Sequence, residues 1–147
     1  MSGPQKQPEN FGKGIPIFPV QDASASVEFF VKVLGFAKNW HYGEFASVSR
    51  GECTIFLCAD EQGKPGTWAF INVDDVDALA AQWQAAGAKL RMTPQNFIWG
   101  YEAHVPDIDG NVLRIAQDHK PGPFGAWTRD DGSRWHQLQD GSWERAE

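Results

Sequence analysis

The sequence predicts an α+β fold in which two βαβββ modules, at about residues 14–60 and 67–118, form a curved mixed sheet with the helices on its convex face. Three observations predict it. Each half opens with an apolar strand and continues with a helix whose apolar residues recur at i, i+3, i+4 and i+7. A glycine follows each helix. Neither half can bury a sheet alone, so the halves should pack side by side around a concave cleft.

The first module begins with a strand at residues 15–20 and a helix that Asp22 or Ser24 can cap, because either side-chain oxygen accepts hydrogen bonds from free helix N–H groups. Gly35 ends this helix, since glycine takes the left-handed conformation at no steric cost. The apolar stripe comprises Val27, Phe30, Val31 and Leu34. Residues 37–41 lead into an extended segment expected at 45–50, and a strand is expected at 53–59, before a loop at 60–66.

The second module repeats this order, with a strand at residues 67–73 and a helix after Asp74 and Asp75. Gly87 ends this helix. Its apolar stripe comprises Val76, Leu79, Ala80 and Trp83. The expected continuation is a strand at 88–92, a loop through Pro94, strands at 99–105 and 111–117, and a hairpin turn at 107–110.

The last segment, residues 119–147, differs from both modules because Trp127, Trp135 and Trp143 recur every eight residues. An Asp-Gly pair stands between each two of these tryptophans, and Asp-Gly is a strong hairpin signal. We therefore expect a small β-meander whose tryptophans share one face. Such a meander is too small to be stable alone, so it should dock on the main domain or on a second subunit.

The composition of the 147 residues is that of one globular domain at 14–118, with residues 1–13 as a flexible tail. The formal charge of −6 disfavours nucleic acid as a partner, and no apolar run approaches the ~20 residues that cross a bilayer. Cys53 and Cys58 fall on opposite faces of one strand and should be reduced thiols. The start of the chain has no secretory signal, so a cytoplasmic protein without membrane partners is expected.

Seven short motifs between residues 13 and 117 carry a resemblance to a known family. They are Ile-Pro-Ile at 15–17, Ser-Val-Glu-Phe-Phe at 26–30, Leu-Gly-Phe at 34–36, Phe-Ala-Ser-Val at 45–48, Thr-Ile-Phe-Leu at 54–57, Trp-Gly-Tyr-Glu at 99–102 and Asp-Ile-Asp-Gly-Asn at 107–111. With these motifs the chain resembles the vicinal oxygen chelate (glyoxalase/bleomycin resistance/dioxygenase) superfamily. Within it the chain is most similar to the bleomycin resistance proteins, which sequester the drug rather than destroy it.

Enzymes of this superfamily hold a divalent metal with four His, Gln or Glu side chains. The resemblance places those positions at Ile15, Phe56, Trp68 and Arg114. None of these side chains can bind a hard divalent cation, so neither a metal nor another cofactor is expected. Glu102 and His104 share a strand face at i, i+2, and a metal pair there stays open as an alternative to the more common hydrogen-bonded pair.

The resemblance also implies a ligand groove with aromatic walls and no catalytic residue. The positions that match it are Trp40, Phe45, Cys58, Trp99 and Tyr101. Strand alternation adds Phe56, Trp68 and Arg114, if the mapped metal positions face the cleft. Flat aromatic faces stack on heteroaromatic rings and an acidic surface attracts cations, so the expected ligand is a bulky, planar, cationic antibiotic of the bleomycin type.

The resistance proteins form homodimers that exchange their first strand, and their hinge proline matches Pro16. We therefore expect a homodimer in which each groove lies between two chains. Two alternatives remain open. One is a metal-dependent enzyme of the glyoxalase, dioxygenase or thiol-transferase type with relocated ligands, and the other is a binding module for another metabolite.

Overall fold

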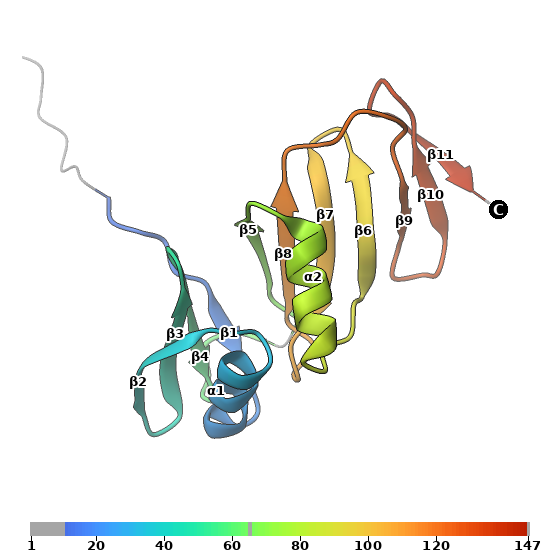
Figure 1. Ribbon diagram of the computed structural model, residues 1–147. Coiled ribbons are helices and arrows are strands. Elements are labelled where there is room, and N and C mark those ends of the chain that lie inside the picture. Colours follow the sequence, from blue (N-terminus) through green and yellow to red (C-terminus); the bar gives the residue numbers. More distant parts are fainter. Residues whose placement is uncertain (1–10, 65, 147) are drawn as a thin grey trace, which may run out of the picture.

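The computed structural model describes residues 11–64 and 66–146 and confirms the predicted α+β fold class (Figure 1). The helices are α1 (Ala23–Lys32) and α2 (Val76–Ala85). The strands are β1 (Ile17–Pro19), β2 (Ala37–Tyr42), β3 (Phe45–Arg50), β4 (Cys53–Cys58), β5 (Trp68–Asn72), β6 (Met92–Phe97), β7 (Gly100–Pro106), β8 (Val112–Gln117), β9 (Ala126–Thr128), β10 (Arg134–Gln137) and β11 (Trp143–Ala146). Sheet A has the strand order β1-β4-β3-β2, sheet B the order β5-β8-β7-β6 and sheet C the order β11-β10-β9.

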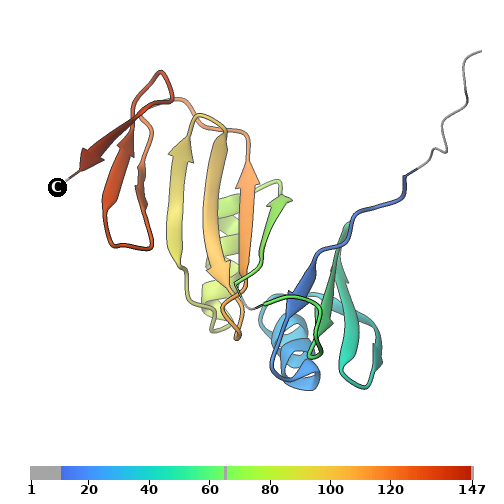
Figure 2. The same ribbon diagram turned by 180° about the vertical axis from the view of Figure 1, so that it is seen from behind.

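Sheets A and B repeat one βαβββ topology. In each sheet the first strand lies parallel to the last, with Ile17 opposite Phe56 in sheet A and Trp68 opposite Val112 in sheet B. The other neighbouring strands are antiparallel. The eight strands form two separate four-stranded sheets, and the edge strands β1 and β5 are the ones nearest to each other in both views (Figures 1 and 2).

Both helices begin at an aspartate cap and lie on the same side of the sheets (Figure 1). Asp22 accepts a hydrogen bond from the Ala25 amide at 3.2 Å, so Asp22 rather than Ser24 caps α1. Asp75 accepts one from the Ala78 amide at 3.0 Å and caps α2. Among the described residues there is no helix with the length and apolar character needed to cross a membrane.

The apolar stripe predicted for α1 is correct except at Val31, which is 38% exposed. The helix ends at Lys32, and Leu34 therefore reaches the core from the turn that follows. The inward face is centred on Val27 and Phe30 and includes the small side chain of Ser26, while Val31 lies at its flank. In α2 the predicted stripe faces inward: Val76, Ala80 and Trp83 are buried, and the partly buried Leu79 packs against the core.

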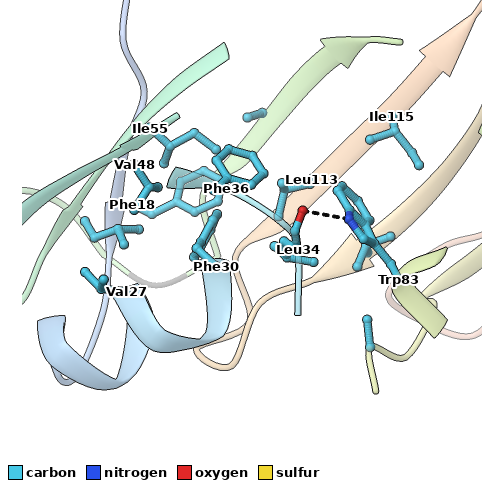
Figure 3. Close-up of a cluster of buried hydrophobic side chains, with 14 of the residues drawn as sticks. Phe18, Val27, Phe30, Leu34, Phe36, Val48, Ile55, Trp83, Leu113 and Ile115 are labelled. Carbon is cyan, nitrogen blue, oxygen red and sulfur yellow. Dashed lines mark hydrogen bonds between the residues drawn. The ribbon is translucent and has the colours of Figure 1, made fainter. Parts of the chain in front are cut away.

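One hydrophobic cluster joins the two modules on the helix side of the sheets (Figure 3). It includes Phe30 and Ile55 from the first module and Trp83 and Ile115 from the second. The indole Nε1 of Trp83 donates a hydrogen bond to the Leu34 carbonyl at 2.9 Å, across the boundary between the modules (Figure 3). The two modules therefore share one core.

The strand predicted at residues 88–92 is wrong, because the structure places β6 at Met92–Phe97, where the sequence suggests a loop. Pro94 is tolerated within β6 for two reasons. The strand lies at the edge of sheet B, and its pairing with β7 shifts between Met92 and Gln95. Neither feature can be read from the local sequence.

The C-terminal meander forms as predicted and docks on sheet B of the same chain, beyond β6 in both views (Figures 1 and 2). The side chain of Gln137 is buried at this contact: its Oε1 accepts from the Ile98 amide at 2.7 Å, and its Nε2 donates to the Gly141 carbonyl at 3.2 Å. The Gly125 amide donates to the Asn96 carbonyl at 2.6 Å. Sheet C is thus attached to the second module by buried hydrogen bonds.

Candidate functional site

The strand faces that point away from the helices carry the candidate site, as strand alternation predicts. The side chains on the helix side are fully buried; they include Ile55, Leu57, Leu113 and Ile115. Phe56, Trp68 and Arg114 alternate with them and remain partly or largely exposed on the opposite face.

On sheet A this face carries an aromatic patch of Trp40, Tyr42, Phe45 and Phe56. The Trp40 ring stacks on Tyr42 at a centroid distance of 5.5 Å and meets Phe45 and Phe56 at 5.1 and 5.2 Å. Tyr42 is 74% exposed, and Cys58 lies buried opposite Phe45 in the strand register. The patch therefore offers flat ring faces to solvent.

On sheet B the same face is organised around Glu102, whose side chain is fully buried. Its carboxylate accepts hydrogen bonds from Arg114 Nε at 2.8 Å, from Arg114 Nη2 at 2.9 Å and from His104 Nε2 at 2.7 Å. The indole N–H of Trp99 donates to the same carboxylate. The predicted hydrogen-bonded pair of Glu102 and His104 is therefore part of a larger network.

The network controls the charge of Glu102. Burial by itself would raise the pKa of this carboxyl, but hydrogen bonds from His104, Arg114 and Trp99 and the positive charge of Arg114 outweigh burial and lower the pKa to about 2. Glu102 is therefore an anion at neutral pH whose acceptor positions are occupied. It positions Arg114 and Trp99 and does not exchange protons near neutrality.

A cleft of about 380 Å³, here called the tryptophan cleft, opens where sheet C meets sheet B. Its lining consists of Trp99, Arg114, Trp127, Arg129, Trp135 and Trp143. The tryptophans of sheet C share one face, as predicted. Trp127 of β9 lies opposite Trp135 of β10, and Trp143 of β11 lies opposite Gln137, which is two positions after Trp135 on β10 and therefore on the same face. The volume lies in the lower part of the range of roughly 300–1,000 Å³ that is common for small-molecule sites.

Ring contacts hold the tryptophan cleft in shape. Phe97 is fully buried and stacks on Trp99 at 4.8 Å with an interplanar angle of 17°. The rings of Trp127 and Trp143 each lie 6.1 Å from Trp99. Trp127 also meets His104 edge-on at 4.9 Å. Aromatic pairs of this kind contribute about 0.5–1.5 kcal/mol each beyond their buried area, so the walls are preorganised.

Trp68 and Tyr101 lie outside the tryptophan cleft. Trp68 packs edge-on against His104 at 5.3 Å, with the guanidinium of Arg91 5.0 Å above its ring. Tyr101 lies on the helix side, where its hydroxyl donates to Asp77, and burial together with this hydrogen bond raises the pKa of Tyr101 to about 12. Trp99 belongs to the turn between β6 and β7. Side-chain alternation does not extend through a turn, so Trp99 and Tyr101 lie on different faces although they are two positions apart.

The remaining predicted site residues form two separate groups. The first group, on sheet A, is Trp40, Phe45, Phe56 and Cys58. The second group, Trp99 and Arg114, lies in the tryptophan cleft. A larger cleft of about 640 Å³ opens between the modules on the helix side, and its lining contains neither group. One chain therefore presents two aromatic surfaces and not one continuous groove.

Reasoning from the sequence did not assign the sheet C tryptophans or Arg129 to a site. The eight-residue spacing identified the shared face of the meander. Its position depends on contacts such as that of Gln137 with Ile98, which are 39 residues apart in the chain. No local signal in the sequence indicates this contact.

The positions that the resemblance assigns to the superfamily's metal ligands carry side chains that do not bind a metal. They are occupied by Ile15, Phe56, Trp68 and Arg114. The three apolar side chains offer no lone pair, and Arg114 is a cation bound to Glu102. Over residues 11–64 and 66–146, no three His, Cys, Asp or Glu side chains gather closely enough to hold an ion.

Comparison with known proteins identifies related sequences and structures. A family model described as the Glyoxalase/Bleomycin resistance protein/Dioxygenase superfamily matches residues 16–115. No curated protein sequence matches the chain. The solved structure of TnmS3, an antibiotic binding protein from Streptomyces sp. CB03234, is 27% identical with a TM-score of 0.63, over 71% of this chain and 93% of that one.

Two further structures are similar. The bleomycin-binding protein from bleomycin-producing Streptomyces verticillus, solved with copper(II)-bleomycin, is 29% identical with a TM-score of 0.62, over 76% of this chain and 99% of that one. A bleomycin resistance determinant encoded on the transposon Tn5 has the same fold, with 20% identity and a TM-score of 0.65 over 74% of this chain and 98% of that one. These relatives are matched over nearly their full length, whereas sheet C lies beyond residue 115, where the family match ends.

Proposed function

Because this chain belongs to the glyoxalase/bleomycin resistance protein/dioxygenase superfamily, we propose that it is an antibiotic-sequestering protein of the bleomycin resistance type. It holds a bulky, planar, cationic ligand in an aromatic groove and releases it unchanged. The observation that carries the proposal is the aromatic patch on sheet A. Two relatives described as antibiotic-binding and bleomycin-binding, at 27% and 29% identity, support it.

The aromatic patch has the chemistry that such a ligand needs. Trp40 presents a ring face beside three other rings, and stacking on heteroaromatic rings requires open faces of this kind. Glu44, Asp60 and Glu61 are exposed. They lie near one another where β3 begins and β4 ends, because the Ala59 amide donates to the Glu44 carbonyl at 2.8 Å. Negative charge beside open rings favours a cationic ligand.

The proposal includes no chemical step. Glu102, the buried carboxylate of the strand face, has its acceptors occupied by three side chains, and its low pKa removes it from proton transfer at neutral pH. We propose the cytoplasm as the compartment, because Cys53 and Cys58 are free thiols, which fits a reducing environment.

We also propose that the working groove forms between two copies of the chain. The aromatic patch lies on sheet A, and the exposed rings of Trp68 and Phe70 lie on sheet B, outside the tryptophan cleft. We propose that sheet B of the partner supplies the second wall of the groove. Pro16 is the proposed hinge for exchange of the first strand, and its carbonyl accepts from the Phe56 amide at 3.0 Å in the single chain. Proline fixes φ and suits an extended entry into a strand.

The oligomeric state tests this arrangement directly. Sedimentation velocity on the purified full chain should give a homodimer at micromolar concentration, because exposed aromatic rings such as Tyr42 are usually covered in an assembly. Replacing Tyr42 by Ser should shift the equilibrium toward monomer. A wild-type protein that sediments as a monomer at these concentrations would exclude the shared groove.

Titration with bleomycin tests the binding function. Bleomycin should quench the tryptophan fluorescence of the full chain with saturation, and Trp40→Ala should weaken binding about tenfold, because the loss of stacking contacts of ~1.4 kcal/mol corresponds to a factor of ten. Added salt should also weaken binding, since it screens the acidic surface.

Trp135→Ala is the matched control for this titration. It removes an indole of the same size from sheet C, at the other end of the molecule from the aromatic patch (Figure 1). The affinity for bleomycin should not change in this variant, and circular dichroism should show that both variants remain folded. A flat titration with the wild-type chain would refute the proposed function.

A further inference from the structure

The tryptophan cleft differs in charge from the rest of the protein. The chain carries a formal charge of −6, yet the six residues that line the cleft include two arginines and no carboxylate. Three of its four tryptophans and Arg129 lie beyond residue 115, where the family match ends. The cleft is thus a feature that sheet C adds to this chain, separate from the aromatic patch to which the proposed function refers.

The cations of the cleft are held over ring faces. The Arg129 guanidinium lies 4.7 Å from the Trp135 ring centroid, and the Arg145 guanidinium lies 5.9 Å from the same ring. Arg114 lies 5.3 Å from the Trp127 ring. Stacking of this kind leaves the edges of a guanidinium free to donate hydrogen bonds to an anion.

Not all of this positive charge is neutralised within the cleft. Glu102 engages Nε and Nη2 of Arg114 and offsets that cation. For Arg129 and Arg145 the carboxylate nearby is Asp131, whose Oδ1 already accepts from the Ser133 amide and hydroxyl. Within the described residues, neither guanidinium donates a hydrogen bond to a carboxylate. The mouth of the cleft is therefore electropositive.

We propose that the tryptophan cleft is a binding site for a flat aromatic anion, that is, a fused ring system that bears a carboxylate or a similar acidic group. The ring stacks between the indoles of Trp99, Trp135 and Trp143, and the acidic group meets Arg129 and Arg145 at the mouth. Guanidinium groups match the planar geometry of a carboxylate with two parallel N–H donors. A cationic ring is disfavoured, because Arg129 and Arg145 at the mouth would repel it.

Three probes with one ring system and different charges test the proposal on the full chain. They are 2-naphthoate, 2-naphthylmethanol and 2-naphthylmethylammonium, measured by isothermal titration calorimetry. The anion should bind about tenfold more tightly than the neutral alcohol, as expected for hydrogen bonds to a charged group, and the cation should bind more weakly than the alcohol. A cation that binds as tightly as the anion would overturn the proposal.

Matched charge variants locate the site. Arg129→Gln should weaken binding of 2-naphthoate about fivefold, near the upper limit for an exposed ion pair, and should leave the alcohol unchanged. Arg134→Gln removes the same charge from the other face of sheet C and should leave all three probes unchanged. Equal effects of the two variants would show attraction by net charge alone and would refute the site. Both side chains are exposed, so these variants should fold normally.

Ring variants separate this inference from the proposed function. Trp135→Ala should weaken all three probes by about tenfold, and Trp40→Ala should change none of them, which is the reverse of the pattern expected for bleomycin. Binding of 2-naphthoate that is unaffected by Trp135→Ala would reject the tryptophan cleft as the site, whatever the result with bleomycin. Failure of bleomycin to bind would reject the proposed function and leave the charge order of the three probes as an independent result.

Discussion

Glu102→Gln should lower the free energy of unfolding by about 3–5 kcal/mol, the cost of removing one partner from a buried ion pair. The substitution keeps the shape of the side chain but leaves Arg114 without its counter-ion. It also replaces one carboxylate oxygen, the acceptor of either His104 or Trp99, by an NH2 donor. Urea unfolding at pH 7, followed by far-UV circular dichroism, measures the change. Glu144→Gln is the matched control, because Glu144 is exposed on sheet C and should lose less than 0.5 kcal/mol by the usual range for surface changes.

The contribution of Glu102 to the free energy of unfolding should decrease as the pH falls. Its pKa is lowered from 4.5 to about 2, so the folded state holds the proton less tightly than the unfolded state. The corresponding stability, about 3 kcal/mol, is fully present above pH 4.5 and is lost as the pH falls toward 2. The difference in stability between wild type and Glu102→Gln should therefore shrink between these pH values. A difference that stays constant down to pH 2 would show that the network does not stabilise the anion.

Trp83→Ala should destabilise the protein by about 3–5 kcal/mol, the range for truncating a buried tryptophan. Trp83 is 2% exposed and reaches from α2 into the core that the two modules share (Figure 3). The loss should appear in urea unfolding as a lower midpoint for a single transition, because both modules depend on this core.

Trp83→Phe separates packing from hydrogen bonding. It keeps most of the ring volume but removes the Nε1 donor to the Leu34 carbonyl, which still accepts from Arg50 Nη1 at 2.7 Å. The expected loss is about 1 kcal/mol. Gln84→Ala, an exposed change on the same helix, should be nearly neutral. An effect of Trp83→Ala no larger than that of Gln84→Ala would contradict a shared core.

The sequence by itself determined the features that depend on short-range order. It placed the helix starts at Asp22 or Ser24 and after Asp74 and Asp75, and the structure has the caps at Asp22 and Asp75. The alternation along β4 and β8 separates Ile55 and Ile115 in the core from Phe56 on the open face. The tryptophan period in the tail identified a meander with one aromatic face. These features follow from helix and strand periodicity, which acts between residues a few positions apart.

Only the tertiary structure decided where these faces meet. The residues that define the sheet B site are brought together over long stretches of chain: Arg114 donates to Glu102 twelve positions away, and Gln137 fixes sheet C on Ile98 from 39 positions away. The sequence placed Tyr101 with Trp99, but Trp99 lies in the turn before β7, where strand alternation does not apply, and Tyr101 within β7 lies on the helix side. The pattern of a segment specifies which of its faces is apolar, whereas the partner of that face depends on the packing and hydrogen bonds of distant segments.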